Sequence, residues 1–173
     1  WEMTDMFHLE AIRLIGKHLR SAVKNEPEGR AGMALAQYIA GMGSSNVGLG
    51  VVHSMAHGLS ALYDMPHGVA CATILPSVLE YNAEYSGEKY RSIAEAMGVE
   101  GVSHMDQTQY RRAAVEAVRH LGTDVGIPVS LTGVLKEADI PFLSESAYAD
   151  ACRPGNPRDV SQAEIEQLYR NLL

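Results

Sequence analysis

Apolar residues recur at helical spacing along most of this 173-residue chain. In residues 4–24, apolar side chains return every three or four positions, which is typical of an amphipathic helix. This stripe consists of Met6, Leu9, Ile12, Leu14, Ile15 and Leu19. Thr4 stands just before the stripe, and its hydroxyl is suited to cap the free N–H groups of a first turn. The pattern therefore predicts a helix over residues 4–24 with Thr4 as its N-cap.

The middle of the chain predicts helices that are apolar on most sides. Residues 30–42 are rich in Ala, Met and Leu and predict a buried helix, and residues 51–63 predict a central helix. Residues 68–82 predict another helix, in which Pro76 introduces a kink. Between the first two, four glycines weaken regular helix but allow a backbone or a ligand to approach closely. These glycines are Gly41, Gly43, Gly48 and Gly50.

The second half is more amphipathic, with apolar stripes opposed by charged faces. The predicted helices are 88–97, 106–122 and 161–172. Asp106 and Ser161 are good N-cap residues for the second and third of these. Residues 123–143 carry two glycines and two prolines and predict a connector with at most short helices.

Residues 144–152 predict one more short helix, and residues 153–158 predict a turn. No segment alternates long enough to predict a strand. We therefore predict a single all-α domain over residues 1–173, with buried helices first and amphipathic helices packed around them.

Composition narrows the function classes. The formal charge is −7 and basic residues do not cluster, which argues against a nucleic-acid or anionic-membrane partner. No apolar stretch reaches the roughly 20 residues of a membrane span. Cys71 and Cys152 stand in unrelated contexts, which favours a reducing compartment over a disulfide framework. These features indicate a soluble cytoplasmic protein. The first residue, Trp1, is not methionine and lies almost within the first helical pattern, so we expect the chain to be part of a longer one.

Three of the seven histidines carry the candidate chemistry. His53 and His57 are four residues apart in an apolar helix, so both imidazoles lie on one face and are close enough to share a metal ion. Spacing alone favours these two as the chelating pair, and hydrogen-bonded core histidines are the alternative. Ser54 takes the place of the glutamate in HExxH, which argues against a zinc protease. The other histidines lie in polar or amphipathic contexts and are expected at the surface; they are His8, His18, His104 and His120.

His67 lies between Pro66 and Gly68. The proline fixes its own backbone and the glycine permits a tight turn into the next helix, so the imidazole is rigidly aimed. An ordinary turn at a helix start is the alternative, although such a turn does not require a histidine.

The segment HSMAHGLSALYDMPHGVACATILPSVLEYN resembles the signature of the iron-containing (group III) alcohol dehydrogenases. The resemblance continues upstream in AGMALAQYIAGMGSSNVGLG and downstream in YRSIAEAMGV, AVEAV, DVGIP and GNPRDVSQAEIEQLY. It thus extends over nearly all 173 residues. Within the family, the similarity is greatest to the members that interconvert lactaldehyde and 1,2-propanediol.

The resemblance implies the helical C-terminal domain of a two-domain, dehydroquinate synthase-like fold. In this family an N-terminal domain binds NAD(P), and an aspartate and three histidines hold Fe(II), or in some members zinc. This chain has no Gly-rich dinucleotide motif. It is therefore expected to be a fragment of a homodimeric enzyme and inactive alone, with part of the ligand set in the preceding residues.

Residue by residue, the resemblance makes His53 and His67 metal ligands, which differs from the pair favoured by spacing. It places His57 near the cofactor and substrate and not on the metal. Because His57 lies one turn from His53, we expect it to be a catalytic residue that relays a proton to solvent. Cys152 matches a residue that lines the pocket. Ser44 matches a phenylalanine beside the nicotinamide, and this difference leaves the pocket shape and the substrate open.

The expected activity is a metal-dependent, NAD(P)-linked interconversion of a small aldehyde and its alcohol, of the lactaldehyde and 1,2-propanediol type. Family members acting on butanol or glycerol, or with dehydroquinate synthase-like chemistry, are the first alternative. A helical metal-binding module without redox chemistry and a purely structural helical bundle are the others.

Overall fold

The computed structural model describes all 173 residues and contains eight α-helices, four short 3₁₀ helices and no strand. The predicted all-α fold class is therefore confirmed. No helix has the combination of length and apolar composition that crossing a membrane requires. The chain divides into two compact units, one formed by residues 1–48 and 86–126 and the other by residues 49–85 and 127–173.

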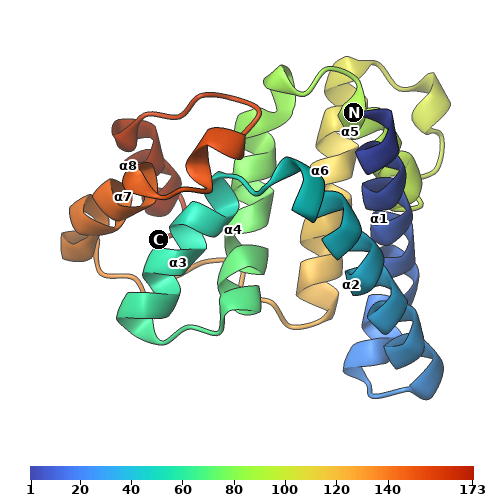
Figure 1. The fold of residues 1–173 in the computed structure, drawn as a ribbon, viewed down its shortest axis with the longest axis horizontal. Helices are drawn as coiled ribbons and strands as arrows, with labels where there is room; N and C mark the ends of the chain where they lie inside the picture. Colours follow the sequence, from blue (N-terminus) through green and yellow to red (C-terminus); the bar gives the residue numbers. More distant parts are fainter. The chain divides into compact units, whose positions relative to one another are not determined.

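The first unit is built on a pair of long helices that lie side by side (Figure 1). Its helices are α1 (Glu2–Val23), α2 (Pro27–Val47), α5 (Lys89–Ala96) and α6 (Gln107–Asp124), with the 3₁₀ helix η2 (Val102–His104). An ion pair of 2.7 Å joins Lys89 at the start of α5 to Asp5 of α1. Another of 2.7 Å joins Arg20 of α1 to Asp124 at the end of α6. Burial and these pairs hold the smaller helices against α1.

The start of α1 differs from the prediction. The helix begins at Glu2 with Trp1 as its N-cap residue, and Thr4 lies within the first turn. The Thr4 side chain is buried, and its hydroxyl donates to the carbonyl oxygen of Trp1 at 2.8 Å. The threonine hydroxyl therefore bonds backward to a carbonyl instead of accepting from free N–H groups, so the N-cap assignment was wrong.

α2 is longer and more exposed than predicted. It runs unbroken through Gly41 and Gly43 and ends at Gly48, whose φ of 78° is the left-handed conformation that favours glycine. A Cβ at Gly43 would lie 2.5 Å from the His8 ring, so this glycine permits close packing of α1 on α2. Gly32 packs on His18 in the same way. Gly43 and Gly32 thus serve helix packing, and of the glycines in this region only Gly48 ends the helix.

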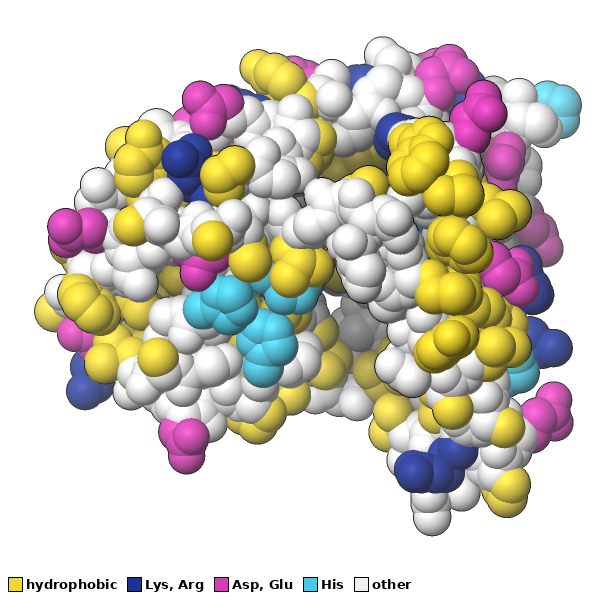
Figure 2. Space-filling model, viewed as in Figure 1, with side chains coloured by type: hydrophobic (Ala, Val, Ile, Leu, Met, Phe, Trp, Pro, Cys, Tyr) yellow, Lys and Arg dark blue, Asp and Glu magenta, His cyan; other side chains and the backbone are white.

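Two further expectations for this unit were wrong. α2 packs through one face only and leaves Leu35 and Tyr38 more than half exposed, so it is not a buried helix. Figure 2 shows hydrophobic side chains gathered on this surface. His8 and His18 are half-buried where they meet the glycines of α2, whereas His104 and His120 are exposed as predicted.

The second unit contains α3 (Val51–Tyr63), α4 (His67–Asn82), α7 (Ile140–Ala149) and α8 (Gln162–Arg170), with η1 (Ala83–Tyr85), η3 (Glu137–Asp139) and η4 (Arg153–Gly155). The bounds of α3 are those predicted, and α7 begins four residues earlier than the predicted helix. A continuous apolar core joins the four helices. Its main contributors are Met55, Leu59, Ile74, Leu143 and Ile165.

Both predicted N-caps in the second half of the chain are confirmed. The Asp106 side chain accepts from the backbone N–H of Gln109, and the Gln109 side chain returns the bond. Ser161 and Glu164 form the same reciprocal capping box at the start of α8. The core of the second unit and its capped helix provide the frame for the three histidines.

Candidate metal centre and its histidine cluster

Three histidines from α3 and α4 meet on the second unit. His53 and His57 lie one turn apart on α3, and His67 is the first residue of α4. The ring centroids of His53 and His67 are 5.4 Å apart, as are those of His57 and His67, and those of His53 and His57 are 6.4 Å apart. Figure 2 shows histidine side chains side by side on the visible face. The structure therefore brings together all three histidines that the sequence singled out.

The link between α3 and α4 explains how His67 reaches the cluster. Asp64 adopts a left-handed conformation, with φ 54°, and ends α3. Pro66 has φ −53° and serves as the N-cap residue of α4, where its carbonyl accepts from the N–H groups of Val69 and Ala70. Two fixed backbone conformations within three residues thus reverse the chain and return His67 to the α3 histidines.

Burial favours the neutral form of His53, which is the form that binds a metal. Its imidazole is half-buried, and burial lowers its pKa below 6.5, with further lowering by the neighbouring charges of His67 and His57. A neutral imidazole at neutral pH keeps a free lone pair for a ligand. The lower pKa therefore suits His53 to metal coordination.

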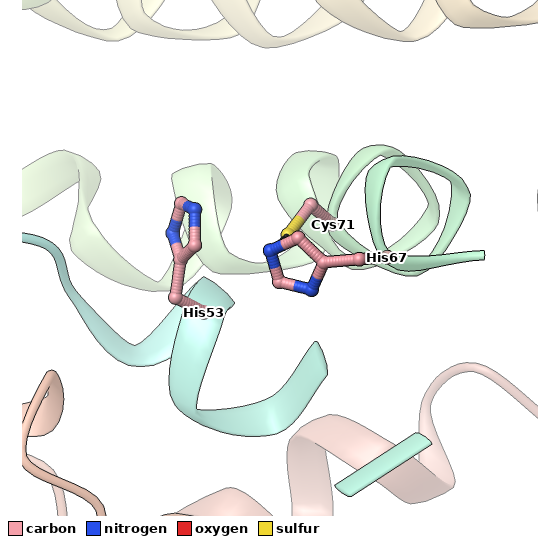
Figure 3. Close-up of side chains that lie close together, drawn as sticks. All are labelled: His53, His67 and Cys71. Carbon is pink, nitrogen blue, oxygen red and sulfur yellow. Dashed lines mark hydrogen bonds between the residues drawn. The ribbon is translucent and has the colours of Figure 1, made fainter. Parts of the chain in front are cut away.

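Cys71 lies beside the same two histidines, one turn after His67 on α4. Its Sγ is 3.5 Å from Nε2 of His67 (Figure 3). One ligand atom from each of His53, His67 and Cys71 lies within 4.8 Å of the others. Burial raises the pKa of the Cys71 thiol. Two imidazoles and a sulfur that converge are donors that zinc and related divalent metals accept, so the residues fit a metal centre.

His57 faces a different set of partners. Its Nδ1 is 2.8 Å from Oδ2 of Asp150, the residue that follows α7. Burial acts to raise the pKa of Asp150, but the hydrogen bond with His57 and that from the Cys152 backbone N–H lower it below 3.8 overall. The Asp150 carboxylate is therefore ionised and can only accept, so Nδ1 of His57 carries a proton.

Cys152 completes this second group. Its backbone N–H donates to Oδ1 of Asp150 at 2.8 Å, and its thiol lies close to the same carboxylate. Burial, then the hydrogen bond and charge of Asp150, raise the pKa of the Cys152 thiol. Cys152, which was predicted to line the pocket, is thus connected to His57 through Asp150, and its side chain is a neutral thiol.

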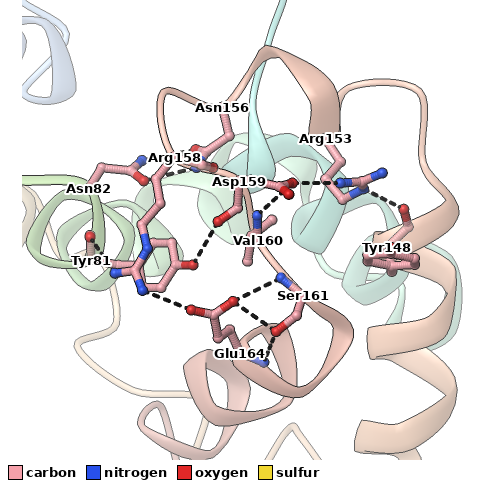
Figure 4. A network of polar contacts seen from close by, with 10 residues as sticks. All are labelled: Tyr81, Asn82, Tyr148, Arg153, Asn156, Arg158, Asp159, Val160, Ser161 and Glu164. Carbon is pink, nitrogen blue, oxygen red and sulfur yellow. Dashed lines mark hydrogen bonds and ion pairs between the residues drawn. The ribbon is translucent and has the colours of Figure 1, made fainter. Parts of the chain in front are cut away.

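The segment that carries Asp150 and Cys152 is held against α4 by a polar network (Figure 4). Asn156 and Asn82 exchange two amide hydrogen bonds of 2.8 and 2.9 Å. Arg158 lies 4.0 Å over the ring of Tyr81 and pairs with Glu164 of α8 at 2.8 Å. Because the segment is fixed to α4 and α8, the position of Asp150 relative to His57 is defined.

Ser44, the fifth predicted site residue, belongs to the first unit. It lies in the last turn of α2, half-buried, and its hydroxyl donates to the Gly41 carbonyl at 3.4 Å. Its predicted place beside the nicotinamide stays a prediction. Sequence reasoning did not assign Cys71 or Asp150 to a site. The four-residue step from His67 to Cys71 on one helix was a usable signal, whereas no local pattern indicated Asp150.

The fold and these groups define a helical domain with a candidate metal centre where two neighbouring helices meet. The chain belongs to the Fe-containing alcohol dehydrogenase family, and residues 1–173 match its C-terminal domain. The predicted family is therefore confirmed.

Known relatives and solved structures agree with this membership. The chain is 52% identical over 171 residues to lactaldehyde reductase of Escherichia coli (strain K12), covering 98% of this chain and 44% of the relative. It is 43% identical to 1,3-propanediol dehydrogenase of Citrobacter freundii, covering 97% and 44%. A crystal structure of 1,3-propanediol oxidoreductase superposes with a TM-score of 0.95 at 41% identity, covering 99% and 45%. The chain thus spans less than half the length of these relatives.

Proposed function

We propose that this chain is the metal-binding part of an NAD(P)-linked oxidoreductase that interconverts a small aldehyde and the corresponding alcohol. The observation that carries the proposal is the grouping of His53 and His67 around one point, with His57 beside them and paired to Asp150. Membership in the Fe-containing alcohol dehydrogenase family supports it.

His53 and His67 are the proposed metal ligands, with further ligands and the nucleotide site in residues outside this chain. The metal, Fe(II) or Zn(II), would act as a Lewis acid on the substrate oxygen while the nicotinamide exchanges hydride with the adjacent carbon. The chain's own contribution is to hold two imidazoles in fixed positions, through the rigid link between α3 and α4.

His57 is the proposed proton relay. Its Nδ1–H donates to Asp150, so Nε2 is the atom that gives a proton during aldehyde reduction and takes one during alcohol oxidation. The His57 side chain is 46% exposed, which allows exchange of that proton with solvent. A neutral Cys152 beside Asp150 adds no charge to the relay.

Lactaldehyde and 1,2-propanediol are the proposed substrate pair, because lactaldehyde reductase is a relative with 52% identity over 98% of this chain. The relatives also include 1,3-propanediol and butanol dehydrogenases, so the assay should compare these alcohols. We propose further that the 173-residue chain is inactive alone; NADH-dependent aldehyde reduction by this polypeptide would refute that statement.

The test compares His53→Ala with His57→Ala in the intact protein that contains this chain. We expect His53→Ala to lose bound metal and activity together. We expect His57→Ala to retain metal and to lower kcat by about 100-fold or more, the usual contribution of a general acid–base group. A His57→Ala protein that loses metal but keeps its activity per metal would refute the relay. An intact protein that binds metal through His53 without any dehydrogenase activity would indicate a non-redox metal-binding module.

A further inference from the structure

His57, Asp150 and Cys152 bring a nitrogen, an oxygen and a sulfur together on the second unit. One ligand atom of each residue lies within 4.8 Å of the others. The imidazole comes from α3, whereas the carboxylate and the thiol stand two residues apart in the turn that follows α7. None of the three is a proposed ligand of the metal at His53 and His67. The cluster is therefore a second set of donor atoms beside the proposed metal centre.

The turn that carries the carboxylate and the thiol is held by its own hydrogen bonds. The N–H of Arg153 donates to the Asp150 carbonyl at 3.2 Å, and the N–H of Gly155 donates to the Cys152 carbonyl at 3.1 Å. The Arg153 side chain also donates from Nε to the carbonyl of Tyr148 at 2.7 Å (Figure 4). Asp150 and Cys152 are thus fixed relative to each other before a ligand arrives, which lowers the entropic cost of binding.

The two carboxylate oxygens of Asp150 have different partners. Oδ1 accepts from the backbone N–H of Cys152 at 2.8 Å and from the hydroxyl of Ser54 at 3.4 Å. Oδ2 faces Nδ1 of His57 at 2.8 Å. A cation at Oδ2 replaces the bond to His57 and leaves those at Oδ1 in place. These remaining bonds orient the carboxylate, as outer-shell partners do in metal sites.

Replacing the shared proton by a cation requires only a small movement. Zinc–nitrogen and zinc–oxygen bonds of about 2.0 Å at a tetrahedral angle place the two atoms about 3.3 Å apart, so the His57–Asp150 pair opens by about half an ångström from 2.8 Å. The His57 side chain is 46% exposed, which leaves room for its ring to move by that amount. The cation therefore fits without a change in the turn.

We propose that Nδ1 of His57, Oδ2 of Asp150 and Sγ of Cys152 form a second, inhibitory site for a thiophilic divalent cation such as Zn²⁺. Imidazole and thiolate favour zinc over magnesium or calcium, and a water molecule takes the fourth position. As the metal–sulfur and metal–nitrogen bonds form, the S–H proton passes to solvent. The imidazole proton moves from Nδ1 to Nε2 through solvent.

The cation also changes the electrostatics of the thiol. Burial, and then the hydrogen bond and charge of Asp150, raise the pKa of Cys152 in the absence of a cation. A divalent charge bound to both groups offsets the carboxylate and stabilises the thiolate, since coordinating thiols lose their proton to the metal. The same carboxylate that keeps the thiol neutral thus becomes its partner in the metal site.

Inhibition follows because the cation occupies the proposed relay residue. The relay requires Nε2 of His57 to give and to take a proton. With a cation on Nδ1, Nε2 holds a proton and has no lone pair to accept another, and releasing that proton would leave an imidazolate. The relay is therefore blocked in both directions. This step rests on the proposed function, whereas binding of the cation does not.

The binding experiment uses Co²⁺ in place of Zn²⁺ on the 173-residue chain. A Co²⁺–thiolate bond produces a charge-transfer band in the near ultraviolet that imidazole and carboxylate ligands do not produce. We expect the band in the wild-type chain and in Cys71→Ser, and its loss in Cys152→Ser. It should persist in the double variant His53→Ala/His67→Ala, which lacks the proposed ligands of the resident metal. Asp150→Asn should weaken Zn²⁺ binding at least about tenfold in competition with a chelator, since even loss of an outer-shell partner costs about 10–100-fold.

The contrary results are equally specific. A band that survives in Cys152→Ser or disappears in Cys71→Ser would overturn the proposal, as would a wild-type chain without a band. Loss of the band in His53→Ala/His67→Ala would show that the thiolate shares the resident metal, and would also overturn it. None of these results depends on dehydrogenase activity, so they are separate from a failure of the proposed function.

The inhibition is measured on the intact protein loaded with Fe²⁺. We expect added Zn²⁺ to lower kcat while the bound iron stays in place. It should be at least about tenfold less potent against Cys152→Ser, relative to the activity of that variant without Zn²⁺. Inhibition that releases the iron would indicate exchange at His53 and His67 and would overturn the inhibitory site. An intact protein without dehydrogenase activity would refute the proposed function, while the cobalt band would still decide the cation site.

A measurement without substitution protects the test against a variant that does not fold. The wild-type chain is treated with iodoacetamide with and without Zn²⁺, and labelling of Cys152 is measured by peptide mapping. We expect Zn²⁺ to slow this labelling at least about tenfold, because the metal-bound sulfur is no longer free to react. Equal labelling of Cys152 with and without Zn²⁺ would overturn the proposal.

Discussion

Nδ1 of His57 lies 2.8 Å from Oδ2 of Asp150, and the other carboxylate oxygen of Asp150 accepts from the backbone N–H of Cys152 at 2.8 Å. The carboxylate is therefore held at both ends. One oxygen is fixed by the backbone of the segment after α7, and the other determines which nitrogen of His57 carries the proton. This arrangement lets a single substitution exchange the two tautomers of His57.

Asp150→Asn should reverse the His57 tautomer. The amide oxygen must remain toward the Cys152 N–H, so the amide NH₂ faces His57 and donates to Nδ1. The proton then moves to Nε2, which can no longer accept one. We expect ¹⁵N NMR of the chain to show Nε2–H in place of Nδ1–H, and kcat of the intact protein to fall about 100-fold or more.

Asp159→Asn is the matched control for this tautomer change. Asp159 lies in the same segment, its side chain is 99% exposed, and it pairs with Arg153 and not with a histidine. It should leave the His57 nitrogens and kcat unchanged. A His57 that keeps Nδ1–H in Asp150→Asn would contradict the assigned role of the carboxylate.

The sequence predicted helix positions best where a local signal exists. Gly50 and the turn before Pro66 bound α3, and Asp106 and Ser161 start α6 and α8 through side-chain caps. Thr4 carried the same kind of signal and was misassigned, because a threonine inside a first turn can bond backward to a carbonyl instead. Burial was harder to predict, since an apolar composition does not show which faces of a helix pack against other helices.

The site could be predicted only in part. Helical spacing joined His53 to His57, and the Pro66–Gly68 turn singled out His67. The family resemblance added the ligand role of His67 and the place of Cys152, but none of these shows how side chains pair. Asp150 lies 93 residues from His57 in the sequence, so its contact depends on the packing of α7 against α3. Helical periodicity relates only residues that are close in the sequence. The carboxylate of Asp150, which orients His57, could therefore be identified only from the structure.

Gly155→Ala should destabilise the second unit. A Cβ at Gly155 would collide with the carbonyl oxygen of Leu49, so the η4 turn or the start of α3 must move. Overpacking of this kind costs about 1–3 kcal/mol. We expect a lower urea midpoint, together with a weakened His57–Asp150 contact, because η4 follows Asp150 closely.

Gly41→Ala is the control for the glycine substitution. Gly41 lies inside α2 with nothing within 4 Å of the new Cβ, so alanine should stabilise that helix by up to about 1 kcal/mol. Equal effects of the two substitutions would show that the Leu49 contact does not constrain η4.

Tyr169→Phe tests a buried hydrogen bond between α8 and α3. The Tyr169 side chain is fully buried, and its hydroxyl donates to the Met55 carbonyl at 2.7 Å. Removing the hydroxyl keeps the ring in the core, so the free energy of unfolding should fall by about 1 kcal/mol. Tyr148→Phe, at an exposed ring that lies against Arg153, should change it by less than about 0.5 kcal/mol. Urea unfolding of both variants measures the difference, and a Tyr169→Phe chain as stable as the wild type would rule out a net contribution from the bond.

Glu164 should make the stability of α8 depend on pH. The backbone N–H and then the hydroxyl of Ser161 hydrogen-bond to its carboxylate and lower its pKa below 4.5. The folded state therefore binds this proton less readily than the unfolded chain does. The stabilisation is complete above the unfolded pKa and is lost as the pH falls through the lower, folded pKa.

Glu164→Gln keeps a side chain that can hydrogen-bond but removes the titrating charge. We expect it to be about 0.5–1 kcal/mol less stable than the wild type at pH 7, the usual range for a cap, with the difference shrinking as the pH falls from 5 to 3. Urea unfolding across this range gives the difference directly. Glu145→Gln, at an exposed position on α7, should show a small difference that does not change with pH. A Glu164→Gln difference that stays constant between pH 7 and pH 3 would mean that the carboxylate charge does not stabilise the capping box, and that the amide serves the Ser161 backbone equally well.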